Sequence, residues 1–143
     1  MAKIAIEQPS EEDVDVIHRV LTTTYWSPGI PRETVARACE NSICVIARDE
    51  SGALVGFARV VSDKATFAWL CDVIVLPGRQ GRGLGRELVR TLQQHEELQG
   101  LRRWLLGTKD AHGVYTPLGF TPVDAPERFM QIKNRHPYGR PAS

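Results

Sequence analysis

The chain has 143 residues, which fits one domain, and its 42% of hydrophobic and 24% of charged residues are close to the globular average. Its formal net charge of +1 excludes a general electrostatic attraction to nucleic acid or to a membrane surface. The three cysteines form no Cys-x-x-Cys pair and have no histidine at zinc-finger spacing, so we expect reduced thiols, no metal site and a cytoplasmic protein. No run approaches the ~18 apolar residues of a membrane span, and we expect neither a membrane nor a nucleic-acid partner.

The first half of the chain alternates between strand and helix patterns. Ser10 is a typical helix N-cap with Asp13 at the third helical position, and apolar residues then recur at helical spacing. Pro31 suits the first position of a second helix, which runs to about Glu40. In chain order we predict a strand over residues 3–7, helices over 11–21 and 31–40, and strands over 42–48, 53–61 and 66–75.

The second half continues with a helix and further strands. We predict a helix over residues 82–97, a strand over 101–106, a short helix over 111–118 that is broken at Pro117, and closing strands over 120–123 and 129–132. From Asn134 the chain is polar and rich in proline, so we predict one domain over 1–133 and a flexible C-terminal tail over 134–143. This order predicts a mixed α/β sandwich, in which antiparallel hairpins lead into a strand–helix–strand crossover.

A glycine-rich loop joins the long strand to the helix that follows it. The first turn of a helix has N–H groups without intrahelical partners, and the helix dipole adds partial positive charge there. Gly81, Gly83 and Gly85 have no side chain that would block access to these amides, and Arg82 and Arg86 add mobile positive charge. The loop therefore predicts a binding site for a phosphate or pyrophosphate.

Other known phosphate motifs fit this loop less well. A P-loop would need a lysine where Leu84 stands, and the glycine spacing is not that of a dinucleotide-binding fold. A tight strand-to-helix turn without a ligand remains an alternative. The arginines Arg82, Arg86 and Arg90 share one helix face, and we interpret them as a solvated face rather than a nucleic-acid site because the net charge is only +1.

Two motifs in this order resemble the GNAT superfamily of acyl-CoA-dependent acyltransferases. The first is Val75-Leu76-Pro77 followed by Gln80-Gly81-Arg82-Gly83-Leu84-Gly85. The second, over residues 105–120, is a strand, a short helix that carries Ala111 and Tyr115, and then Gly119-Phe120. The resemblance extends over the element order from the first strand to about Ile132.

The resemblance implies a mixed, mostly antiparallel sheet with helices on both faces and a V-shaped splay between two central parallel strands. The pantetheine arm of the coenzyme would lie in this splay, and the pyrophosphate would lie on the loop amides. It implies these coenzyme-binding residues: Val73, Ile74, Val75, Gln80, Gly81, Arg82, Gly83, Leu84, Gly85, Arg86, Thr108 and Asp110. Thr108 stands where many members of the family have asparagine.

The chemistry of thioester aminolysis needs a proton for the departing thiolate and removal of a proton from the amine. The resemblance places Tyr115 beside the coenzyme sulfur, and the tyrosine pKa of ~10 is near that of an alkyl thiol, so Tyr115 is the candidate general acid. Asp72, on the long strand, is the second catalytic candidate. It is either the base for the amine, a group that binds a cationic substrate, or the partner of a salt bridge. His112 is interpreted as a surface histidine.

The acceptor pocket would be lined by the loop after the first helix and by the strands that face it. The candidates are Tyr25, Trp26, Arg59 and Trp69. An aromatic wall attracts an ammonium group, and Arg59 can hold a carboxylate. For Trp69 the alternative is ordinary sheet packing, and for Arg59 it is a solvated charge.

The expected function is therefore an N-acetyltransferase that moves the acetyl group from acetyl-CoA to a primary amine by direct attack in a ternary complex. We expect a small-molecule amine as the acceptor and no metal. Members of the family are often dimers, so a homodimer remains open. The alternative is a non-catalytic acyl-CoA-binding sensor or partner module on the same fold.

Overall fold

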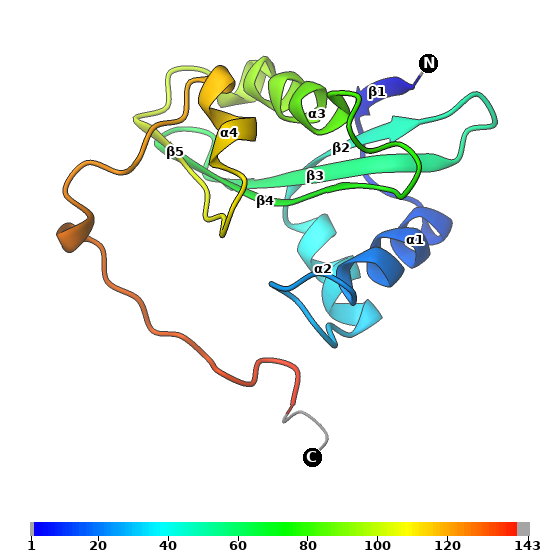
Figure 1. Cartoon of the computed structure of the whole chain (residues 1–143), viewed down its shortest axis with the longest axis horizontal. Helices are drawn as coiled ribbons and strands as arrows, with labels where there is room; N and C mark the ends of the chain where they lie inside the picture. The colour runs from blue at the N-terminus through cyan, green and yellow to red at the C-terminus, as the bar shows by residue number, and fades with distance from the viewer. Residues whose placement is uncertain (1, 140–143) are drawn as a thin grey trace.

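The computed structural model describes residues 2–139, which form one sheet with helices on both of its faces (Figure 1). The strands are β1 (Lys3–Ile6), β2 (Ile43–Arg48), β3 (Leu54–Ser62), β4 (Phe67–Val75) and β5 (Arg103–Leu105). The helices are α1 (Glu11–Leu21), α2 (Arg32–Glu40), α3 (Leu84–Gln93) and α4 (His112–Tyr115), with 3-10 turns η1 (Glu96–Leu98), η2 (Thr116–Leu118) and η3 (Pro126–Arg128). No helix within residues 2–139 has the length and apolar content needed to cross a bilayer.

The strands lie in chain order across the sheet, β1-β2-β3-β4-β5. The first four are antiparallel, and β5 lies parallel to β4 because α3 crosses over between them. The parallel ladder runs only from Phe67, opposite Arg103, to Trp69, opposite Leu105, while β4 continues to Val75. The two strands therefore part toward the end of β4, and the predicted mixed sheet with a splay between its parallel strands is confirmed.

Helix α1 begins at the predicted cap and is fixed to the sheet by an ion pair. The Ser10 hydroxyl accepts a bond from the Asp13 N–H at 3.2 Å, and the Asp13 carboxylate accepts one from the Ser10 N–H at 2.9 Å. The same buried carboxylate receives two bonds from the Arg48 guanidinium, at 2.9 and 2.7 Å. This bidentate pair joins the first turn of α1 to the end of β2. At α2, Pro31 is the N-cap rather than the first helical residue, so that helix begins one position later than predicted.

The core has two halves, one on each face of the sheet. Val45 packs in the half under α3, and its neighbour Ile46 packs in the half under α1 and α2. Phe57 and Ala58 divide in the same way, because successive residues of a strand point to opposite faces. Two covered faces explain why β2 and β3 are apolar almost throughout. Gly56 lets α3 approach β3 closely, since a Cβ there would lie 3.1 Å from Leu88 Cδ1.

Several sequence predictions for the second half were wrong. Helix α3 ends at Gln93, and the turn η1 replaces its predicted last turn. The predicted closing strands over 120–123 and 129–132 do not form, so β5 is the edge strand of the sheet within residues 2–139. Pro122 and Pro126 have no N–H to donate to a ladder, and Ala125 has a left-handed backbone (φ 52°) where the chain turns away from the sheet.

The C-terminal segment then follows an extended path away from β5 (Figure 1). It returns at Tyr138, which packs against the half of the core under α1 and α2. The predicted tail began at Asn134, whereas regular structure already ends at the turn η3. Residues 140–143 of that predicted tail lie outside the described residues.

Candidate active site

A β-bulge in β4 creates the first part of the site. Phe57 pairs with Ile74 and Arg59 pairs with Cys71, so three steps along β4 correspond to two steps along β3. Asp72 lies within this extra stretch and has a left-handed backbone (φ 51°), a conformation that aspartate tolerates better than most residues. The sequence pattern did not predict the bulge. The one signal for it was an aspartate inside an otherwise apolar strand.

Three of the predicted site residues meet at this bulge. The Trp26 indole N–H donates to Asp72 Oδ1 at 2.8 Å, and Arg59 Nε donates to Asp72 Oδ2 at 2.7 Å. Arg59 Nη1 also donates to the Ser42 hydroxyl at 3.1 Å. The Arg59 and Asp72 side chains are only 18% and 11% exposed. The salt-bridge interpretation of Asp72 is therefore confirmed, and both of its carboxylate oxygens already accept an N–H.

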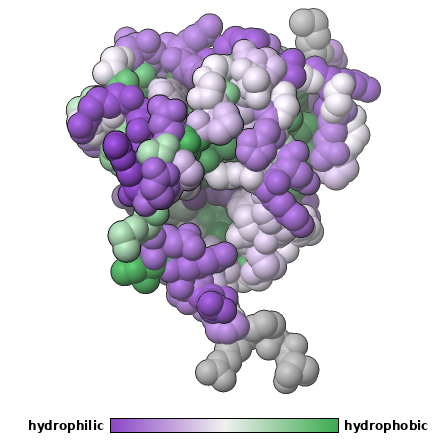
Figure 2. Space-filling model, turned by 60° about the vertical axis from the view of Figure 1, so that its left-hand side comes forward, coloured by the Kyte–Doolittle hydropathy of each residue, from purple (hydrophilic) through white to green (hydrophobic). Residues whose placement is uncertain are grey.

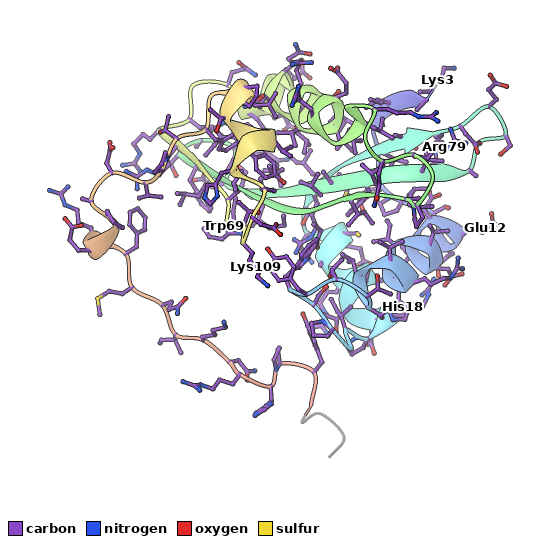
Figure 3. All side chains as sticks on the ribbon, viewed as in Figure 1. Lys3, Glu12, His18, Trp69, Arg79 and Lys109 are labelled. Atoms are coloured by element: carbon purple, nitrogen blue, oxygen red, sulfur yellow. The ribbon has the colours of Figure 1, made fainter. Side chains whose placement is uncertain are left out.

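The loop after α1 reaches across to the loop after β5. The Tyr25 hydroxyl accepts a bond from the Lys109 N–H at 2.9 Å, and the Lys109 ammonium lies 5.6 Å from the centre of the Tyr25 ring. Tyr25 and Trp26 pack edge to face at 5.1 Å. Trp69 lies on the same side of the sheet, since its neighbours in β4 pack under α3, and it is labelled near Lys109 in Figure 3. Its ring makes no pair with Tyr25 or Trp26 among the described contacts, and it is 43% exposed.

The glycine loop leaves the start of α3 open. Gly83 is the N-cap of α3, and no side chain caps this end of the helix. Gly81 and Gly83 both have φ of +78°, and a Cβ built at either position meets no atom within 4 Å. At Gly85 a Cβ would contact the Val75 side chain at 3.7 Å, which shows how closely the helix start approaches the end of β4. No side chain therefore fills the space at Gly81 and Gly83, and glycine forms this left-handed loop without strain.

The side chains around this loop have different partners. Gln80 Nε2 donates to the Val75 carbonyl at 3.0 Å, which ties the loop to the strand, and Arg90 pairs with Glu87 on the helix surface. Arg82 is exposed, whereas Arg86 is half-buried. Within the described residues, the buried Arg86 Nε has no hydrogen-bond partner. An uncapped helix start whose glycines leave free space fits a pyrophosphate group.

Tyr115 lies at the other side of the splay, on the short helix α4. It is half-buried, and its ring meets Phe120 edge to face at 5.9 Å. Burial, and to a smaller extent nearby Tyr25, raises the pKa of the Tyr115 hydroxyl, so this group keeps its proton at neutral pH. The Thr108 hydroxyl accepts a bond from the Ala111 N–H at 3.1 Å and so stabilises the turn before α4. Asp110 is exposed on the same turn, and His112 is exposed as predicted.

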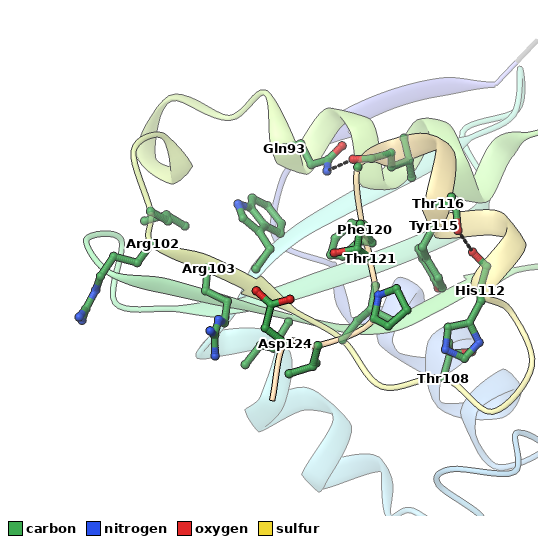
Figure 4. A pocket seen from close by; sticks show the side chains of 18 residues that line it. Gln93, Arg102, Arg103, Thr108, His112, Tyr115, Thr116, Phe120, Thr121 and Asp124 are labelled. Atoms are coloured by element: carbon green, nitrogen blue, oxygen red, sulfur yellow. Dashed lines mark hydrogen bonds between the residues drawn. The ribbon is translucent and has the colours of Figure 1, made fainter. Parts of the chain in front are cut away.

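Two cavities that the described residues form lie beside this site. A hollow of about 80 Å³ lies beneath the bulge and is lined by Arg59, Asp72 and, from the C-terminal segment, Tyr138. Tyr138 was not among the predicted site residues, because no local pattern in the sequence marks it. A larger hollow of about 540 Å³ lies along the outer edge of β5, with Tyr115 at one end of it (Figure 4).

Comparisons with known proteins agree with this geometry. The sequence pattern of the acetyltransferase (GNAT) family matches residues 12–120. A crystal structure of a GNAT-family protein from Xanthomonas campestris pv. campestris is 41% identical, with a TM-score of 0.89 over 98% of this chain and 99% of that chain. The acetyltransferase-named protein FG08082 of Gibberella zeae is 32% identical over 71% of this chain and 69% of its own length.

A more distant likeness shows the fold alone. The aminoglycoside N-acetyltransferase AAC(6')-Iy, solved in complex with CoA, has a TM-score of 0.66 and 21% identity over 94% of this chain and 97% of that chain. Further relatives are longer than this chain, which spans between 40% and 55% of their length. The family match over residues 12–120 covers the bulge, the glycine loop and Tyr115. The chain therefore belongs to the acetyltransferase (GNAT) family.

Proposed function

We propose that this protein is an N-acetyltransferase that moves the acetyl group from acetyl-CoA to a primary amine of a small-molecule acceptor, with both substrates bound together. The observation that carries the proposal is the uncapped N-terminus of α3, which faces free space at Gly81 and Gly83 beside the splayed end of β4. A site of this kind binds a diphosphate through backbone N–H groups and the helix dipole.

The coenzyme would be held by the backbone of β4 and by the glycine loop. Residues Val73, Ile74 and Val75 line the splay, and the loop from Gln80 to Arg86 would take the pyrophosphate. For Gln80 the backbone N–H is the proposed contact, because its side chain already binds the Val75 carbonyl. Thr108 and Asp110 would contact the coenzyme from the turn before α4.

The proposed reaction is a direct aminolysis. The amine lone pair forms a bond to the thioester carbonyl carbon, and the electron pair of the C=O bond moves to oxygen as an oxyanion. The oxyanion then collapses, the C–S bond breaks, and the Tyr115 hydroxyl gives its proton to the departing thiolate. Solvent reprotonates the tyrosinate and takes the proton of the amine. The raised pKa of Tyr115 supports this role, since the hydroxyl is protonated when the thiolate leaves.

Asp72 has a positioning role in this proposal. Its two carboxylate oxygens accept bonds from Trp26 and Arg59, so it holds the bulge and the loop after α1 in one arrangement. A carboxylate engaged on both oxygens is poorly placed to take a proton from the amine. The acceptor would lie over this cluster, with Tyr25, Trp26 and Trp69 as aromatic contacts for its ammonium form.

A small acceptor is supported by the size of the site. The hollow beneath the bulge is about 80 Å³, and the Tyr25 loop is tied to the loop after β5 by the bond to Lys109. The alternative is a coenzyme-binding module without catalysis. The geometry of the coenzyme loop suits both, whereas a half-buried, protonated Tyr115 beside the splay favours the enzyme.

The test has two steps on one sample of the purified chain. Calorimetric titration with acetyl-CoA measures binding, and thiol release is then followed over a panel of primary amines. We expect binding in the micromolar range and release of CoA thiol with one class of small amines. Binding without release on any amine would favour the non-catalytic module, and the absence of binding would refute the coenzyme site.

A further inference from the structure

Helices α1 and α2 cover only part of the sheet face on which they lie (Figure 1). Their core includes Phe57 of β3 and its partner Ile74 of β4. Within the described residues, that core contains no apolar residue of β3 after Phe57 and none of β4 before Ile74. The uncovered part of this face carries three large apolar side chains, which we call the apolar strip: Val61, Phe67 and Trp69.

The apolar strip points away from α3 and is open to solvent. The residues next to it in sequence, Val60, Ala68 and Leu70, pack in the core under α3, and successive residues of a strand point to opposite faces. Val61 and Trp69 are paired across β3 and β4, so their side chains lie side by side. The strip is between 38% and 43% exposed, and in the view from the β5 side green, apolar atoms lie recessed between polar ones (Figure 2). An exposed apolar patch with a polar rim is typical of a binding site.

The apolar strip leads along β4 to the bulge. Asp72 lies three residues beyond Trp69, which corresponds to about 10 Å at ~3.3 Å per residue. Trp26 is bonded to Asp72 and adds a second indole at this end of the strip. In the proposed function, the amine of the acceptor lies beside the bulge. An apolar group of the same acceptor therefore reaches the strip when a chain of several bonds separates it from the amine.

The charges around the strip favour an acid on the acceptor over a second amine. The Asp72 carboxylate already accepts two N–H bonds. At the bulge end, the Lys109 ammonium lies 5.6 Å from the centre of the Tyr25 ring and pairs with no carboxylate in the described part of the chain. At the other end, Arg103 is paired with Phe67 across the sheet and likewise contacts an aromatic ring rather than a carboxylate among residues 2–139. A polyamine would meet cations at both ends of the strip, whereas a carboxylate would give one of them a partner.

We propose that the acceptor is an aliphatic amine that carries an apolar ring and a carboxylate several bonds away from its amine. The amine lies at the bulge, the ring packs on the apolar strip, and the carboxylate is bound by the ammonium of Lys109. This inference rests on the proposed function, because it names the substrate class of the same reaction. It predicts that simple alkylamines and polyamines are poor acceptors.

Four amines that share one five-carbon chain test the ring and the carboxylate separately. Nα-benzoyl-lysine has both groups, N-benzoylcadaverine has only the ring, 6-aminohexanoate has only the carboxylate, and pentylamine has neither. Thiol release from acetyl-CoA gives kcat/KM for each. We expect Nα-benzoyl-lysine to exceed 6-aminohexanoate about 10-fold through burial of the ring, and N-benzoylcadaverine about fivefold through an exposed ion pair. Equal values for the four amines, or a higher value for spermidine, would overturn the proposal.

Two substitutions assign each preference to its contact. Trp69→Ala should bring the ratio of Nα-benzoyl-lysine to 6-aminohexanoate close to one. Lys109→Gln should do the same for the ratio of Nα-benzoyl-lysine to N-benzoylcadaverine, while the main-chain bond from residue 109 to Tyr25 is kept. Lys3→Gln is the matched control, since it makes the same charge change on β1, at the opposite edge of the sheet from β5. Each ratio compares two acceptors on one sample, so a partial loss of folded protein cancels. Ratios that neither variant changes would refute these contacts.

A binding measurement separates a failure of this inference from a failure of the proposed function. The indole N–H signals of the three tryptophans are followed by ¹H–¹⁵N NMR while Nα-benzoyl-lysine is added in the presence of excess CoA. We expect the signals of Trp26 and Trp69 to shift, and that of Trp104, which packs under α3, to stay in place. These shifts without thiol release from any amine would refute the proposed catalysis and support the ligand class. Absence of the shifts would overturn the ligand class, whether or not thiol is released.

Discussion

Replacing Gly83 with glutamate tests the coenzyme site where its geometry is most explicit. Gly83 is the N-cap of α3, has φ of +78°, and would have no atom within 4 Å of a Cβ placed on it. A glutamate side chain therefore finds space without a clash, and its carboxylate lies beside the amides that we assign to the pyrophosphate. The expected effect is electrostatic repulsion of acetyl-CoA with the fold kept.

The magnitude follows from the charge and the exposure of the loop. Two like charges 4 Å apart repel by about 4 kcal/mol at an effective dielectric constant of 20. The loop is exposed, so we take about half of this value, and about 2 kcal/mol corresponds to an increase of about 30-fold in Kd. Any side chain at this left-handed position also costs about 1 kcal/mol of folding stability, whatever its charge.

Two further variants separate charge from strain. Gly83→Ala carries the same backbone strain without the charge, and we expect its Kd to stay within about threefold of the wild-type value. Gly100→Glu makes the same charge change at a glycine with φ of +73° and free space around it, in the loop after η1. Calorimetric titration with acetyl-CoA measures all three. Equal Kd values for Gly83→Glu and Gly83→Ala would show that the diphosphate does not bind at this helix start.

Three further substitutions test the chemistry and the packing. Tyr115→Phe should lower kcat about 100-fold with Kd for acetyl-CoA unchanged, and an unchanged kcat in thiol release would exclude Tyr115 as the proton donor. Because burial raises the pKa of Tyr115, the wild-type rate should fall only above pH ~10, and this fall should be absent in the variant. Asp13→Asn should cost about 2 kcal/mol of unfolding free energy at pH 7. The Arg48 guanidinium lowers the pKa of Asp13, so the contribution of this ion pair to the unfolding free energy is present above pH ~4 and is lost as the pH falls through the folded-state pKa of Asp13. Urea titrations in which Asp13→Asn costs the same at pH 7 and pH 2 would contradict the ion pair. Gly56→Ala places a methyl group 3.1 Å from the fully buried Leu88 side chain and should cost about 1 kcal/mol, and a rise in Tm would show that α3 yields instead.

Short-range signals in the sequence predicted the scaffold well. The capping box at Ser10 and Asp13 formed as predicted, because its two partners are three residues apart and their contact is part of the helix start itself. The glycine loop also lies where predicted, since Gly81 and Gly83 adopt the backbone that glycine tolerates best. Helix ends were less well predicted, and α3 stops four residues early.

Long-range contacts decided the site itself. The bond from Trp26 to Asp72 joins residues 46 positions apart, and the bond from Tyr25 to Lys109 joins residues 84 positions apart. No local pattern indicates such pairs. The bulge at Asp72 likewise depends on how β4 is aligned with β3, and alignment between strands is a property of the folded sheet.

The segment after Gly119 shows where a prediction from local sequence failed for lack of a tertiary partner. Its apolar residues predicted two strands, and the residues have the composition that strands need. A strand also requires a partner edge within reach, and the turn at Ala125 carries the chain away from β5. The sequence by itself determined the order of the elements as far as α4, the helix cap and the position of the glycine loop, because these depend on neighbours along the chain. The tertiary structure decided which charged and aromatic side chains meet at the bulge and which edge of the sheet stays open, because these depend on contacts between distant segments.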